Sequence, residues 1–173
     1  IALGGIGLLL TLWRGLYLSG VYLRIRRQMQ DLQQPSTGNP LGRVLSAVEG
    51  VSLDEEELLQ LKLDEAVLAE MPALERGNGV IKLLAATSPL LGLLGTVTGM
   101  ILTFQAISLF GTGDPKLMAG GISQALVTTV LGLVVAIPLL FSHSVIAYMS
   151  RAMIQRLDEQ CAGVLARTAE QGT

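Results

Sequence analysis

Two long stretches of the chain carry almost no charge. From Leu83 to Phe110 there is no Asp, Glu, Lys, Arg or His, and from Leu117 to Ser150 the only ionisable side chain apart from tyrosine is His143. Each stretch exceeds the roughly 20 apolar residues that a helix needs to cross a bilayer. Buried helices of a soluble domain are rarely uncharged on every face for so long. The pattern therefore predicts transmembrane helices at 83–110 and 122–149.

A third apolar segment opens the chain, and it closes on the basic run RIRR. A secretory signal also has an apolar core, but its basic residues precede that core, and no small-residue cleavage site is clear here. We expect a first transmembrane helix at 1–23, shortened at its N-terminus because the chain begins without Met. Trp13, Tyr17 and Tyr22 would then lie in the aromatic belt at the membrane surface.

The distribution of Lys and Arg predicts the topology. These residues gather between the first and second apolar segments and after the third, whereas the link between the second and third holds only Lys116. By the positive-inside rule, 24–82 is a cytoplasmic helical region, 111–121 a short outward-facing link and 150–173 a cytoplasmic C-terminal helix. The expected fold is an all-α membrane protein with three transmembrane helices and long helices extending into the cytoplasm, its N-terminus outside.

Within the region 24–82, residues 33–43 are rich in Pro, Gly, Ser and Asn and predict a loop. A helix follows, because Ser52 and Glu55 have the spacing of a capping box. Pro72 is expected to bend or interrupt this helix. Its acidic residues are most simply a solvated face, and no His or Cys accompanies them to make a metal site. The apolar face is expected to consist of Leu58, Leu61, Val67, Leu68 and Met71.

Small and polar residues recur along the two uncharged segments at spacings of three, four and seven, which place them on one face of each helix. Small residues let helices approach closely in lipid, where packing drives association. We expect Gly92, Gly95, Gly99 and Gly132 to serve such packing, and Pro89 and Pro138 to bend their helices. The two faces comprise Ser88, Gly92, Gly95, Thr96, Gly99 and Thr103 in the second segment, and Gly121, Ala125, Thr128, Thr129, Gly132 and Ala136 in the third.

Some of the polar residues are candidates for lining an ion path, since polar side chains in membrane helices tend to face a bundle interior or a cavity. The candidates are Thr96, Thr129 and Gln124. Threonine also serves in structural packing, and Gln124 near the outer end of its helix has headgroup contact as an alternative. His143 is either a proton relay or a structural residue near the cytoplasmic end of its helix.

Several classes of function find no support in the sequence. The net charge of −2 and the lack of a basic patch interleaved with aromatics argue against nucleic acid. The single cysteine, Cys161, excludes an internal disulfide and a multi-cysteine metal site. There is no P-loop, G-x-S-x-G or H-E-x-x-H motif, so we expect no enzyme, no cofactor and no metal site. A secondary transporter usually needs more helices or a clear repeat.

The motifs SPLLGLLGTVTGMILTF and GISQALVTTVLGLVVAIP, in this order, closely resemble the paired signature of the ExbB/TolQ/MotA family of proton-driven energising proteins. The resemblance covers roughly Leu83 to Tyr148 and is closest to the ExbB branch, including the type called TtpC in TonB systems. It implies a homopentamer in the bacterial inner membrane, surrounding a dimeric ExbD-like partner that supplies the proton-binding aspartate. Threonines matching Thr96 and Thr129 would line the pore beside that aspartate.

The same resemblance implies that proton flow rotates the partner inside the ring, and that TonB passes the motion to outer-membrane receptors for nutrient uptake. The N-terminus and the link 111–121 would then be periplasmic. Many relatives have glutamate where this chain has Gln124, which cannot titrate, so this subunit offers no acid there. The alternatives are a TolQ-like role in envelope integrity and a non-conducting structural scaffold. A MotA-like role fits less well, because that branch has four membrane helices.

Overall fold

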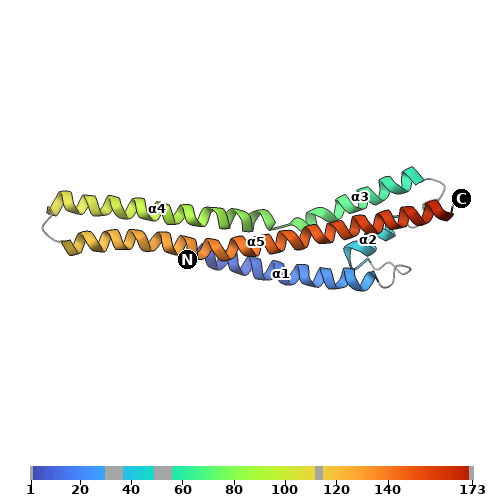
Figure 1. Ribbon diagram of the computed structural model, residues 1–173, viewed down its shortest axis with the longest axis horizontal. Coiled ribbons are helices and arrows are strands. Elements are labelled where there is room, and N and C mark those ends of the chain that lie inside the picture. Colours follow the sequence, from blue (N-terminus) through green and yellow to red (C-terminus); the bar gives the residue numbers. More distant parts are fainter. Residues whose placement is uncertain (1, 30–36, 49–55, 112–114, 172–173) are drawn as a thin grey trace. The chain divides into compact units, whose positions relative to one another are not determined.

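The computed structural model describes the whole chain except residues 1, 30–36, 49–55, 112–114 and 172–173. Its helices, in chain order, are α1 (Ala2–Gln28), α2 (Pro40–Ser46), α3 (Glu56–Glu75), α4 (Asn78–Phe110) and α5 (Pro115–Gln171) (Figure 1). The described residues contain no strand, and three helical stretches among them are long and apolar enough to cross a membrane. The all-α fold class and its three membrane-spanning helices are thereby confirmed. The three stretches are Ala2–Gln28, Glu57–Leu109 and Met118–Arg167.

The chain divides into two compact units, the first formed by 1–12 with 77–144 and the second by 13–76 with 145–173. In the first unit, α4 and the beginning of α5 run side by side in opposite directions (Figure 1). The helix α4 ends at Phe110 and is capped by Gly111, whose φ of 76° favours glycine and whose N–H donates to the carbonyl of Ile107 at 2.8 Å. The start of α1 packs on α5, where Gly4 faces Val135 and Gly7 faces Leu139.

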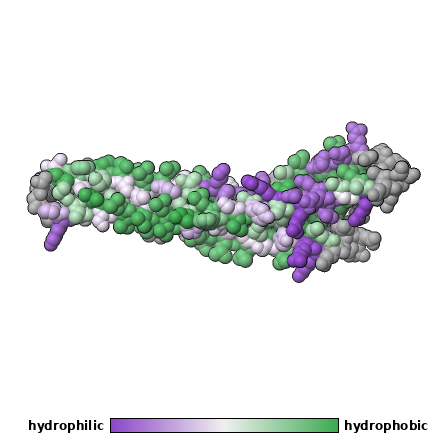
Figure 2. All heavy atoms as spheres, viewed as in Figure 1, coloured by the Kyte–Doolittle hydropathy of each residue, from purple (hydrophilic) through white to green (hydrophobic). Residues whose placement is uncertain are grey.

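The surface of the first unit is mostly apolar, as the green covering of α4 and the first part of α5 shows in Figure 2. Large side chains such as Leu102, Phe104 and Phe141 are more than half exposed. So much exposed apolar surface is typical of a face that meets lipid or other protein chains. The charged residues are concentrated in the second unit, where purple atoms predominate (Figure 2).

The second unit has a core of apolar side chains from α1, α2, α3 and the end of α5. Its most buried members are Leu18, Ile25, Leu41, Val44, Leu63, Leu74, Met153 and Leu157. An exposed ion pair joins Arg43 of α2 to Glu70 of α3, with two hydrogen bonds of 2.6 and 2.7 Å between guanidinium and carboxylate. These bonds raise the pKa of Arg43.

The predicted loop at 33–43 is wrong in its last part, because α2 begins at Pro40. The Asn39 side chain caps this helix by accepting the N–H of Gly42 at 2.8 Å, and Pro40 occupies the first helical position, which proline favours. The same residue types are common in loops, so composition alone led to the wrong assignment. The proposed capping box at Ser52 and Glu55 lies outside the described residues.

The predicted apolar face of α3 is also wrong in part. Val67 is buried and Met71 is half-buried, but Leu58, Leu61 and Leu68 are 40 %, 65 % and 63 % exposed. The helix buries a neighbouring stripe instead, namely Leu59, Leu63, Val67 and Leu74. Because leucines occupy two sides of α3, hydrophobicity did not identify the side that packs within the chain. The helix continues through Pro72 to Glu75, so Pro72 does not interrupt it.

Candidate functional site

The helices α4 and α5 touch along a line of small residues, namely glycine, alanine, serine and threonine. A Cβ atom added to Gly92 would lie 3.0 Å from the carbonyl oxygen of Thr128 and 3.3 Å from the Cα of Gly132. One added to Gly132 would lie 2.9 Å from the carbonyl oxygen of Ser88. Both contacts are with backbone, which has little freedom to move aside.

The close approach continues toward the C-terminal end of α4 and the N-terminal end of α5. A Cβ on Gly95 would meet the Thr128 side chain at 2.5 Å, and one on Gly99 would meet the Cβ of Ala125 at 2.8 Å. At the next step Thr103 lies directly against Gly121. Small residues of α4 thus alternate with small residues of α5 over several turns, which is the arrangement that brings helices together in lipid.

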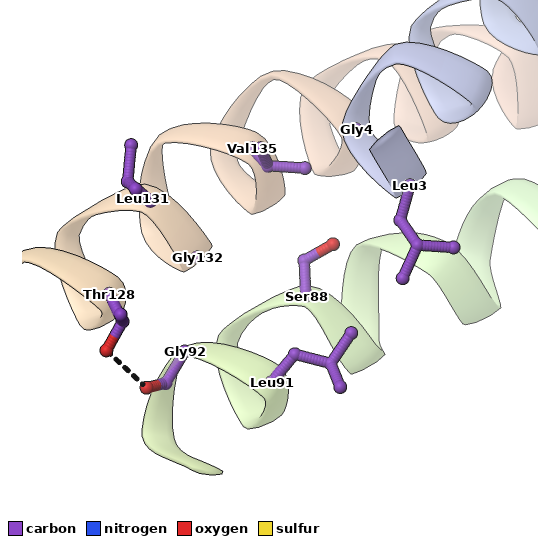
Figure 3. A pocket seen from close by; sticks show the side chains of 9 residues that line it. All are labelled: Leu3, Gly4, Ser88, Leu91, Gly92, Thr128, Leu131, Gly132 and Val135. Carbon is purple, nitrogen blue, oxygen red and sulfur yellow. Dashed lines mark hydrogen bonds between the residues drawn. The ribbon is translucent and has the colours of Figure 1, made fainter. Parts of the chain in front are cut away.

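Two grooves flank this contact. The first has a volume of about 210 Å³, and Figure 3 shows its side chains converging from α1, α4 and α5. Its lining is mostly apolar, and its polar members Ser88 and Thr128 bond to backbone carbonyls: Ser88 to Leu84 at 2.7 Å, and Thr128 to Ala125 at 2.6 Å. The longer Thr128 contact drawn in Figure 3 reaches the carbonyl of Gly92 at 3.4 Å. This groove therefore has no free donor of its own.

The second groove, of about 280 Å³, has more polar side chains in its lining than the first. Gln124 lines it together with three threonines, Thr98, Thr103 and Thr128. Thr98 and Thr103 each bond back to a carbonyl of α4, at 3.0 Å and 2.9 Å. Gln124 is exposed. The structure thus places Gln124 beside a set of threonines other than the pair expected to share an ion path with it.

Thr96 and Thr129 lie outside both grooves. The Thr96 hydroxyl donates to the carbonyl of Leu93 in its own helix at 2.6 Å. The Thr129 hydroxyl points across to α4, where the carbonyl of Gly92 lies 3.4 Å away, a long distance for a hydroxyl bond. Both residues are half-buried, so within one chain each hydroxyl remains partly accessible from outside. Their pore-lining role stays a prediction.

The remaining candidates have simple surroundings. The helix α4 continues through Pro89 and α5 through Pro138, and the expected bends stay predictions. His143 is half-buried in α5. Neither α4 nor α5 up to Ser150 contains Asp or Glu, so this part of the molecule supplies hydroxyl and amide groups but no carboxylate. Among the described residues, no group of His, Cys, Asp and Glu is placed to hold a metal ion.

Arg14 of α1 was not recognised from the sequence as a residue of interest. It is only 6 % exposed, and its guanidinium donates to the carbonyls of Ala73 and Leu74. A charged residue in an apolar segment is expensive and usually has a specific partner. Its position inside the first apolar stretch was the available signal.

The sequence of the chain is similar to those of known membrane-transport proteins. Residues 27–159 match the family model described as the MotA/TolQ/ExbB proton channel family. The chain is 32 % identical over 167 residues to the biopolymer transport protein ExbB-like 3 of Synechocystis, covering 87 % of this chain and 80 % of that protein. It is 33 % and 35 % identical to proteins named biopolymer transport protein ExbB from Xanthomonas campestris and Salmonella typhimurium.

These two matches cover 63 % and 60 % of the chain, and the chain covers 43 % of each relative's length. The family model spans most of the chain, and the Synechocystis match covers most of both proteins. Together with three helices able to span a membrane, these matches make the protein a multi-pass membrane protein. The chain belongs to the MotA/TolQ/ExbB proton channel family.

Proposed function

We propose that the chain is the ExbB-like subunit of an inner-membrane complex that uses the proton motive force to energise TonB-dependent uptake across the outer membrane. The observation that carries the proposal is the combination of polar hydroxyls and a missing acid. The helices α4 and α5 offer threonines and Gln124 along their apolar lengths, but no carboxylate before Asp158. Apart from His143, the two uncharged stretches have no side chain that titrates near neutral pH, and we assign the proton-binding carboxylate to another chain.

That other chain is an ExbD-like membrane partner carrying an aspartate, and five copies of the present chain form a ring around a dimer of it. A TonB-like protein receives the motion. The exposed apolar side chains of α4 and α5 supply surface for lipid, for sister subunits and for the partner. The N-terminus is periplasmic and the C-terminus cytoplasmic. The chain itself is not an enzyme, holds no cofactor and binds no nucleic acid, and the transported ion is H⁺.

The proposal is tested with the chain and its ExbD-like partner reconstituted together in liposomes containing a pH-sensitive dye. Acidification of the lumen under an imposed gradient is expected only when both proteins are present. Thr96→Val and Thr129→Val keep the shape of each side chain but remove the hydroxyl, and each is expected to slow proton entry at least tenfold.

Thr87→Val is the matched control, because Thr87 is, like Thr96, a half-buried threonine of α4 that donates to its own helix, at 2.9 Å, but it is not proposed to line the path. Normal proton entry with both Thr96 and Thr129 replaced would exclude them from the path. No proton entry with the wild-type complex would favour the structural scaffold. Proton entry combined with normal TonB-dependent uptake in cells lacking the protein would favour the TolQ-like role.

A further inference from the structure

The C-terminal end of α3 has no basic residue in its last turn, and the chain leaves the helix through Arg76 and Gly77, whose φ is 86°. The last four carbonyls of a helix have no partner inside it, and the partial negative charge at this end favours a nearby cation. The last turn of α3 includes Glu75 and the imino acid Pro72. Donors from other helices can therefore add to the stability of this end.

Arg14 of α1 supplies that stabilisation. One nitrogen of its guanidinium, Nη2, lies 2.6 Å from the carbonyl oxygen of Leu74 and 3.0 Å from that of Ala73. Hydrogen bonds from a charged donor are about twice as strong as neutral ones. The ring of Tyr17, one turn further along α1, lies 5.2 Å from the guanidinium carbon, at a distance that permits a cation–π contact.

A second helix reaches the same point. Ser150 of α5 is 1 % exposed, and its hydroxyl donates to the carbonyl of Leu74 at 2.8 Å. Leu74 itself is 1 % exposed. One carbonyl at the end of α3 thus accepts hydrogen bonds from both α1 and α5, in a setting where water has little access.

We propose that Arg14 is a positioning residue, which together with Ser150 caps the C-terminal end of α3 and fastens it to α1 and α5. The proposal rests on the packing of the second unit and does not depend on the proposed channel function.

The test is hydrogen–deuterium exchange of the full chain in lipid nanodiscs, read from peptides covering 70–77. Arg14→Met keeps much of the apolar stem but removes the cation, and should speed exchange of these amides roughly tenfold. Ser150→Ala should give a smaller acceleration in the same peptides. Arg24→Met is the matched control, since Arg24 is an exposed arginine of the same helix, and should match the wild type.

Arg14→Lys restores the charge without the planar fork of donors, and should recover part of the protection. Three results would overturn the proposal. The first is wild-type exchange at 70–77 in both Arg14→Met and Ser150→Ala. The second is an acceleration in Arg14→Met that spreads evenly over α1, α2 and α3. The third is exchange in Arg14→Lys that is as fast as in Arg14→Met. Either of these last two results would assign Arg14 to general packing.

Discussion

At the scale of single residues, the contact between α4 and α5 depends on glycines, which have no side chain to separate the two helices. Gly92 and Gly132 face each other with their Cα atoms so close that a methyl group on either would press on backbone. Other glycines of α5, such as Gly120 and Gly163, have open space around them. The contact therefore depends on particular glycines. Replacing a glycine by alanine should lower stability at the helix contact and should not lower it where the glycine has open space around it.

Gly132→Ala should lower the stability of the chain by about 1–3 kcal/mol, because the added methyl would lie 2.9 Å from the carbonyl oxygen of Ser88. Gly120→Ala is the control in the same helix and should leave stability unchanged or raise it by up to about 1 kcal/mol, since alanine is the better helix former. The unfolding midpoint in detergent measures both. Equal midpoints for the two variants would contradict the close contact.

Cys161 provides a prediction about pH. It is 6 % exposed in the C-terminal part of α5, and burial, with smaller contributions from Asp158 and Asp64, raises the pKa of its thiol to about 11. The reactive thiolate is therefore scarce at neutral pH, and a higher pH is needed to form it. The rate of alkylation by iodoacetamide should keep rising about tenfold per pH unit from pH 8 to 10.

Mass spectrometry of the intact chain measures this rate at a single position, because the chain has one cysteine. Slow access to a buried thiol lowers the rate at every pH but does not move the midpoint. A rate that levels off near pH 8.5, the ordinary thiol pKa, would show that Cys161 is not held in a buried, negatively charged setting.

At the scale of elements, the length of the uncharged stretches was enough to predict the long helices, because few other structures contain so many consecutive apolar residues. The short helix α2 was missed because its start depends on one side-chain bond, from Asn39 to Gly42, which composition does not reveal. The packed side of α3 was misassigned because leucines lie on two of its sides. The partner of Arg14 was not predictable, because Leu74 is 60 positions away along the chain.

The cap on α2 can be tested directly. Asn39→Ala removes the acceptor for the Gly42 N–H and also the amide that donates to Gln28 at 3.1 Å, and should cost about 1 kcal/mol of stability. Asn39→Asp keeps the capping oxygen but loses the donor to Gln28, so it should recover part of the loss. Exchange rates of peptides covering 39–47 report on α2 specifically. Unchanged exchange in Asn39→Ala would remove Asn39 from its capping role.

At the scale of the whole molecule, Arg14 brings two predicted regions into conflict. The expected membrane helix 1–23 continues past Arg14, whereas its partners Ala73 and Leu74 belong to the region 24–82, expected in the cytoplasm. The guanidinium of Arg14 lies 3.0 Å and 2.6 Å from these two carbonyls, so all three groups must lie together either in water or in lipid. The charged residues of α3 need water, so the apolar part of α1 inside the membrane should end near Arg14.

Trp13 tests this boundary without a label, because it is the only tryptophan of the chain and is 68 % exposed. Tryptophan favours the membrane surface, so lipids with a quencher near the headgroup should reduce its fluorescence more than lipids with a quencher deep in the tails. The comparison uses Leu9→Trp in a Trp13→Phe background. Leu9 is 70 % exposed and one turn earlier in α1, about 6 Å along the helix. This second tryptophan should respond more to the deep quencher. Stronger deep quenching at Trp13 itself would instead place Trp13 below the membrane surface and require the end of α3 to enter the bilayer with Arg14.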